Sequence, residues 1–114
     1  MNEIKRILNA CKYSASGFAA ALESEAAFRW DVLIFIVGTC VAFMLPITRT
    51  EALILIFSLV LILLMELANT AIETIVDRIS KDAHPLSKKA KDIGSLLVFI
   101  SFANAILTWI LILK

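Results

Sequence analysis

Four polar side chains recur along one face of an otherwise apolar stretch of the chain. Glu66 follows fourteen uncharged residues, and Asn69, Glu73 and Asp77 come three, seven and eleven positions later. On an α-helix, the three carboxylates lie within about 40° of one another and Asn69 lies about 60° to the side. A stripe of this kind can hold a divalent cation, act as a general base on a hydroxyl, or relay protons or ions.

The stripe belongs to the second of three apolar segments, and a helix that spans a bilayer needs about 20 such residues. Uncharged runs cover 32–47, 52–65 and 93–113, and we predict transmembrane helices at about 30–47, 52–79 and 92–113. An acid at bilayer depth costs roughly 2.5–3.5 kcal/mol, so the stripe is expected to face a protein groove or a wet cavity. Asp77 at the membrane exit and Glu73 one turn deeper also fit purely structural roles. Glu66 lies too deep for that explanation.

Residues 1–29 differ from the spans, because their apolar side chains recur every three or four positions. These apolar positions are Ile4, Ile7, Leu8, Cys11, Ala15, Phe18, Leu22 and Ala26. Lys5, Arg6 and Lys12 lie between them and give the other face a basic character. This pattern predicts an amphipathic helix that lies along a membrane surface.

Composition and charge exclude several classes of protein. With 61% hydrophobic and 18% charged residues in a chain of 114, the sequence is too apolar for a small soluble domain. A net charge of +1 provides no bulk attraction to nucleic acid. Basic residues gather before the first span and around 78–91, so the N-terminus is expected in the cytoplasm and the C-terminus outside. We therefore predict a single all-α membrane domain over 1–114, with one surface helix and three transmembrane helices.

A basic cluster precedes the third span, with Lys88, Lys89, Lys91 and Asp92 close together. Lysines beside metal-binding carboxylates suit a polyphosphate, although positive-inside anchoring explains most of the cluster equally well. The chain has no GxxxxGK[ST], GxGxxG, GxSxG or HExxH motif. Phosphoryl transfer would thus proceed without the usual nucleotide cradle. A small ion or proton transporter and a non-enzymatic membrane scaffold remain alternatives.

Three segments resemble the small bacterial integral-membrane diacylglycerol kinases. They are ELANTAIETIVDR at 66–78, HPLSKKAKDIGS at 84–95 and EAAFR at 25–29. The resemblance covers nearly the whole chain. It implies an enzyme of the bacterial inner membrane that phosphorylates diacylglycerol with ATP and Mg²⁺. It also implies a homotrimer whose active sites are shared between neighbouring subunits. A sister branch phosphorylates undecaprenol, and the short matches at 25–29 and 108–111 favour the diacylglycerol branch.

The same resemblance implies roles for individual residues. Glu66 is expected to be the general base for the lipid hydroxyl, Asn69 to orient that hydroxyl or the transferred phosphate, and Asp92 to take part in catalysis. Mg²⁺ is expected on Glu25 and Glu73. The expected ATP-binding residues are Arg6, Tyr13, Glu25, Glu73, Asp82, His84, Lys91 and Asp92. The expected lipid-binding residues are Arg6, Ser14, Glu66, Ser95 and Trp109.

Overall fold

The protein consists of four α-helices in the computed structural model, which describes residues 2–114. They are α1 (Glu3–Ser24), α2 (Ala26–Met44), α3 (Arg49–Ile79) and α4 (Pro85–Leu113). The last three are long and apolar enough to cross a membrane, which confirms the predicted class of an all-helical membrane protein. The fourth helix begins seven residues before the predicted span at 92, so its first turns carry the basic cluster.

The starts of α3 and α4 follow from local capping. The hydroxyl of Thr48 accepts a hydrogen bond from the Glu51 amide, and the Glu51 carboxylate accepts one from the Thr48 amide, which is a complete capping box. At α4, Nδ1 of His84 accepts a hydrogen bond from the Leu86 amide at 3.1 Å. Pro85 occupies the first turn, where its missing N–H is no loss. His84 is therefore a helix cap, as well as a residue of the loop.

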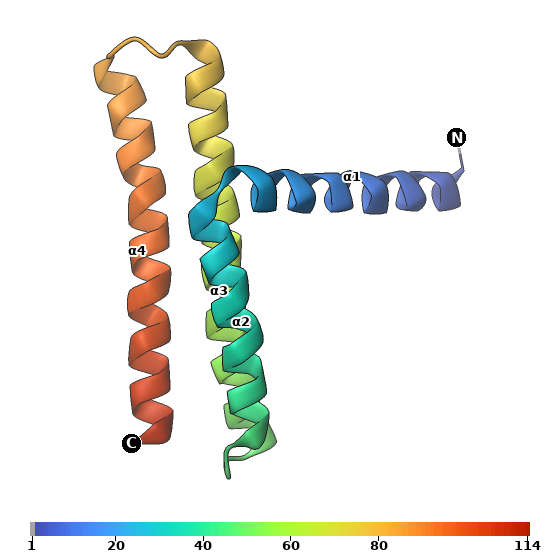
Figure 1. Ribbon diagram of the computed structural model, residues 1–114, viewed down its shortest axis with the longest axis vertical. Helices are drawn as coiled ribbons and strands as arrows, with labels where there is room; N and C mark the ends of the chain where they lie inside the picture. The colour runs from blue at the N-terminus through green and yellow to red at the C-terminus, as the bar shows by residue number, and fades with distance from the viewer. Residues whose placement is uncertain (1) are drawn as a thin grey trace.

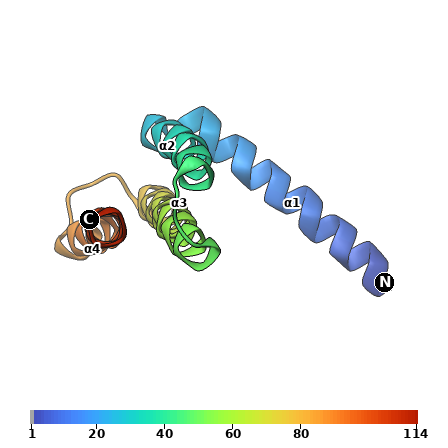
Figure 2. The same cartoon turned by 90° about the horizontal axis from the view of Figure 1, so that it is seen from below.

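Helices α2, α3 and α4 form a row, and α1 extends from this row as an arm. The central helix α3 packs against both α2 and α4, and α1 leads away from this row (Figure 2). The arm α1 stands across the other three, and the linked ends of α3 and α4 extend past it (Figure 1). At 31 residues, α3 is about 46 Å long, well beyond a hydrocarbon core of about 30 Å. One end of α3 therefore projects out of the membrane, on the same side as α1.

The arm has the exposed apolar face that a membrane surface requires. Ala21 is its one buried residue, whereas Ile4, Leu8 and Phe18 are exposed. Outside the membrane this exposure would be unfavourable, and at the interface the lipid covers it. The structure thus fits the predicted surface helix, although α1 ends at Ser24 rather than at residue 29.

The corner between α1 and α2 is held by Arg29. Its guanidinium donates hydrogen bonds to the carbonyl oxygens of Leu22 at 2.6 Å and Glu23 at 3.2 Å. These carbonyls lie in the last turn of α1, where the helix provides no amide partner. Glu25 lies at the corner itself, in extended conformation between the two helices. Arg29 therefore fixes the direction in which α1 leaves the row, and with it the position of Glu25.

We predict that Arg29→Met loosens this corner without affecting the spans. Methionine keeps the apolar stem but donates no hydrogen bonds, so the last turn of α1 loses about 1 kcal/mol of local stability. That loss corresponds to roughly fivefold faster amide exchange at residues 21–25. Hydrogen exchange in detergent micelles measures it, with Lys12→Met as a control on the exposed face of α1. Equal exchange in the two variants would contradict the role of Arg29.

Candidate active site

A pair of acids lies between α2 and α3 within the membrane part of the structure. Asp31 of α2 and Glu66 of α3 are 5% and 7% exposed, and their side chains lie close enough to interact, with Oδ2 of Asp31 buried without a hydrogen-bond partner among residues 2–114. A carboxylate only accepts hydrogen bonds, so a bond between two carboxyl groups requires a proton on one of them. Two buried carboxyl groups this close are therefore expected to share one proton and to carry a single negative charge.

Burial of Glu66 agrees with the prediction that the stripe faces protein, but sequence reasoning missed its partner. The uncharged run of the first span begins at residue 32, so the sequence gives no reason to place Asp31 inside the protein. Only the structure shows which face of α2 points inward. Phe28 lies three residues earlier and is 1% exposed, which puts Asp31 on the inward face of α2.

The upper part of the stripe is less enclosed than Glu66. Asn69 and Glu73 are half-buried, and Asp77 is exposed at the end of α3. With a rise of 1.5 Å per residue, Glu73 lies about 10 Å and Asp77 about 17 Å above Glu66 along the helix. The stripe thus leads from the buried carboxyl pair up to the loop between α3 and α4.

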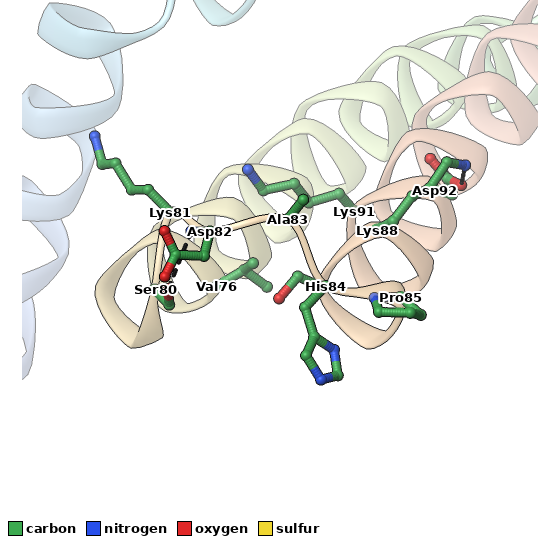
Figure 3. Close-up of a pocket in the computed structure, with 11 residues that line it drawn as sticks. Val76, Ser80, Lys81, Asp82, Ala83, His84, Pro85, Lys88, Lys91 and Asp92 are labelled. Carbon is green, nitrogen blue, oxygen red and sulfur yellow. Dashed lines mark hydrogen bonds and ion pairs between the residues drawn. The ribbon is translucent and has the colours of Figure 1, made fainter.

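That loop forms a pocket of about 680 Å³ with the start of α4. Four of the predicted nucleotide residues line it: Asp82, His84, Lys91 and Asp92. Lys81 and Lys88 line it as well, so three lysines belong to one concave surface (Figure 3). The structure brings these residues together although they come from a loop and from two turns of a helix.

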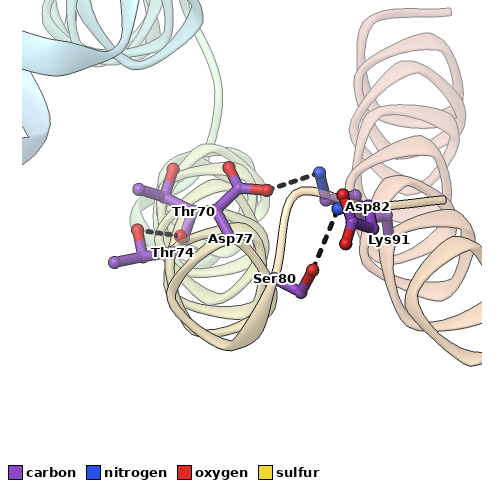
Figure 4. A network of polar contacts seen from close by, with 6 residues as sticks. All are labelled: Thr70, Thr74, Asp77, Ser80, Asp82 and Lys91. Atoms are coloured by element: carbon purple, nitrogen blue, oxygen red, sulfur yellow. Dashed lines mark hydrogen bonds and ion pairs between the residues drawn. The ribbon is translucent and has the colours of Figure 1, made fainter. Parts of the chain in front are cut away.

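Two ion pairs order the side chains around the pocket. Lys91 reaches from α4 to Asp77 on α3, with its Nζ 2.7 Å from the carboxylate (Figure 4). Lys88 and Asp92 pair within α4 at 2.6 Å. Both pairs are more than a third exposed and contribute little to stability. They hold the two lysines and Asp92 in place, and their partners can be exchanged for other charged groups.

The two predicted metal ligands lie at similar heights. Glu25 is six residues above Asp31 and Glu73 is seven above Glu66, which gives about 9 and 10 Å above the carboxyl pair. Both are half-buried. Within residues 2–114, no three acids, histidines or cysteines are close enough to hold a metal ion. Two carboxylates are nevertheless the set that Mg²⁺ uses when the phosphates of a nucleotide and waters complete its coordination.

Some predicted residues are not brought to this site within one chain. Arg6, Tyr13 and Ser14 are exposed on α1, which points away from α3 and α4 (Figure 2). Arg6 pairs instead with Glu3 at 3.3 Å. Ser95 is exposed on α4. A single chain therefore does not assemble the whole predicted set.

An apolar groove of about 520 Å³ runs between α2 and α4 over α3. Trp109 lines it and donates a hydrogen bond from Nε1 to Oγ of Ser58 at 3.1 Å. Ile62, one turn below Glu66, and Trp30, next to Asp31, also line the groove. The groove therefore lies in the apolar part of the molecule, directly below the carboxyl pair.

Comparison with known proteins places the chain in a family. The model of the prokaryotic diacylglycerol kinase family matches residues 12–113. The chain belongs to this family. It is 49% identical over 110 residues to a diacylglycerol kinase of Pseudomonas aeruginosa, covering 96% of this chain and 89% of the relative. It is 39% identical over 108 residues to a diacylglycerol kinase of Escherichia coli K12, covering 95% and 88%.

A more distant relative, a diacylglycerol kinase of Helicobacter pylori, is 35% identical over 105 residues and covers 92% of this chain and 82% of its own length. The family membership confirms the resemblance seen in residues 66–78 and 84–95. Its members act as lipid kinases, which is the class of enzyme predicted here. The match includes α2, α3 and α4 in full, and so both acids of the carboxyl pair.

We predict an energetic coupling between Asp31 and Glu66. Changing either residue to alanine leaves the other carboxyl group buried without its partner. Changing both leaves no unpartnered carboxyl group. The double variant is therefore expected to be less destabilised than the sum of the single variants, by about 0.5–3 kcal/mol. Unfolding by denaturant in detergent micelles measures this difference. The matched control is the cycle of Asp31 with Glu73, expected to be additive. Additive effects of Asp31 and Glu66 would refute the pair.

Proposed function

We propose that the chain transfers the γ-phosphate of ATP to the hydroxyl of diacylglycerol, with Glu66 as the general base. Membership of the prokaryotic diacylglycerol kinase family supports the class of reaction. The observation that carries the assignment of the base is the burial of Glu66 on a membrane helix, about 10 Å below the height of Glu73. The hydroxyl of a diacylglycerol lies near that depth, at the edge of the hydrocarbon.

Asp31 assists Glu66 in this proposal. The shared proton leaves one carboxylate oxygen free to accept the proton of the lipid hydroxyl. The pair then carries one negative charge before the transfer and none after it, so no second charge is buried at bilayer depth. Phosphoryl transfer requires little covalent chemistry from the protein. The main task of the protein is to position the hydroxyl against the phosphate.

The phosphates of ATP occupy the pocket at the start of α4. Lys88 and Lys91 provide positive charge there, and each can exchange its carboxylate partner for a phosphate oxygen. Asp92 and His84 border the same pocket. Glu25 and Glu73 would hold Mg²⁺, which supplies the neutralisation of phosphate charge when bound. Asn69, between Glu66 and Glu73, would orient the lipid hydroxyl or the transferred group.

The lipid enters from the membrane side, with an acyl chain in the groove beside Trp109. This follows from the position of the groove, which is apolar and opens below Glu66. A chain seated there places its glycerol end at the carboxyl pair. Ser95 lies outside this groove and would contact the head group from α4.

The site is completed by neighbouring subunits of a homotrimer. The support is that Arg6, Tyr13 and Ser14 lie on an arm that points away from the pocket of their own chain. The arm of a neighbour would bring these residues to the nucleotide and the lipid head group. In this arrangement the N-terminus and the loop at 80–84 face the cytoplasm of a bacterial cell, where ATP is available.

Phosphorylation of diacylglycerol tests this function directly. We expect the purified chain in mixed micelles with labelled ATP and Mg²⁺ to phosphorylate diacylglycerol faster than undecaprenol. Glu66→Gln should lower turnover by about 100-fold or more, because glutamine cannot accept the proton. Glu51→Gln is the matched control, since glutamine preserves the capping box at the far end of the same helix.

The outcome separates the alternatives. Substantial turnover by Glu66→Gln, with Glu51→Gln as the reference, would remove Glu66 from the role of base. Faster phosphorylation of undecaprenol would reassign the lipid and keep the mechanism. Ion or proton flux in sealed vesicles, without phosphorylated lipid, would replace the kinase by a transporter.

Glu73→Ala tests the proposed metal ligand. We expect a higher Mg²⁺ concentration for half-maximal rate as well as a lower maximal rate, because one of two carboxylates is lost. Titration of Mg²⁺ at fixed ATP measures both. Glu51→Ala is the control for loss of an acid from the same helix. An unchanged Mg²⁺ titration in Glu73→Ala would contradict the assignment.

A further inference from the structure

Gly94 lies on α4 where this helix packs against the polar stripe of α3. The residue is buried. The space that a Cβ would occupy is already filled by the side chain of Asn69, whose Oδ1 and Cγ are the nearest atoms. Cδ1 of Ile72 follows at 3.6 Å. The carboxamide of Asn69 therefore lies directly against the backbone of the neighbouring helix, in a gap that exists because residue 94 has no side chain.

No hydrogen bond holds that end of the carboxamide. Oδ1 of Asn69 is buried and has no hydrogen-bond partner within residues 2–114. A buried acceptor without a partner costs about 1–3 kcal/mol, and such groups in native proteins call for a reason. With no hydrogen bond to orient it, the position of the oxygen is set by the shape of the gap at Gly94.

We infer that Gly94 is a positioning residue for phosphoryl transfer, which acts by leaving room for the carboxamide of Asn69. The inference rests on the proposed function, in which Asn69 orients the reacting groups one turn above Glu66. Gly94 itself touches neither the substrate nor the nucleotide. The absence of a side chain at Gly94 determines which positions the Asn69 carboxamide can occupy.

The other two glycines of the chain show that this contact is particular to Gly94. Gly17 on α1 has nothing within 4 Å of an added Cβ. At Gly38 on α2, which lines the apolar groove, an added Cβ would meet Cδ1 of Leu59 and the ring of Trp109, so the crowding there is with apolar atoms. Gly94 alone faces a polar side chain of the stripe. Gly17 is thus a control for activity, and Gly38 is a crowded control for a measurement that does not depend on lipid binding.

The expected effect of Gly94→Ala follows from which atoms move. The clash is with the far end of a rotatable side chain, so the carboxamide swings aside while the two helices stay packed. Alanine also favours the helix relative to glycine, which offsets part of any loss in packing. Stability should change little. Because a displacement of about 1 Å at a reacting group can cost on the order of 100-fold in rate, the effect should appear in kcat.

The activity experiment compares Gly94→Ala with Gly17→Ala in the full chain. We expect Gly94→Ala to lower kcat by about 10- to 100-fold with KM for ATP and lipid nearly unchanged. The Gly17→Ala control should keep the wild-type kcat. In an Asn69→Ala background, Gly94→Ala should lower kcat no further, because the group it displaces is already gone. A wild-type kcat in Gly94→Ala, or an equal loss in both backgrounds, would overturn the inference.

A second measurement does not depend on activity. In a sample labelled with ¹⁵N at asparagine, the side-chain amide signal of Asn69 is identified by its absence in Asn69→Ala. We expect this signal to shift in Gly94→Ala and to stay in place in Gly38→Ala. An unmoved signal would overturn the role of Gly94. If the signal shifts but the protein phosphorylates no lipid, the role of Gly94 in positioning Asn69 is supported and only the proposed function is rejected.

Discussion

The carboxyl pair of Asp31 and Glu66 is the interaction on which the arrangement of the site depends. An acid on a membrane helix must avoid lipid, so α3 has to present Glu66 to a neighbouring helix. Contact with Asp31 satisfies that requirement and sets the register of α2 against α3. Once this register is set, Glu25 and Glu73 come to similar heights on their two helices. The position of the metal ligands in the proposed function thus follows from a pair of acids two turns below them.

A second consequence concerns the membrane itself. The corner at Glu25 turns α1 across the row of helices, and its apolar face is left exposed for lipid. On the prediction that α1 lies along the membrane surface, this corner sets the level of that surface relative to α3. The carboxyl pair then lies below that level and the pocket at the start of α4 lies above it. The molecule separates an apolar layer with a buried acid from a wet layer with lysines, and the polar stripe connects the two.

Much of the fold and part of the site could be predicted from the sequence, because they depend on local patterns of residues. Apolar runs predicted three spans, and the three-to-four spacing of residues 1–29 predicted the surface helix. The cost of a buried acid predicted that Glu66 faces protein. The partner of Glu66 could not be found in this way, because the burial of Asp31 depends on which face α3 turns toward α2. The gap at Gly94 is likewise a property of two packed helices, and no pattern within α4 alone shows that Asn69 fills it.

The height of each group along the stripe limits how the proposed reaction can take place. The lipid hydroxyl cannot rise far without pulling acyl chains out of the apolar groove, and the phosphates of ATP cannot descend far without burying charge. The two must therefore meet between Glu66 and Glu73, a distance of about 10 Å along α3. Asn69 is the residue of the stripe within that interval, and its side chain is held by the packing of α3 against α4 rather than by hydrogen bonds. The geometry of the transfer is thus tied to the contact between these two helices.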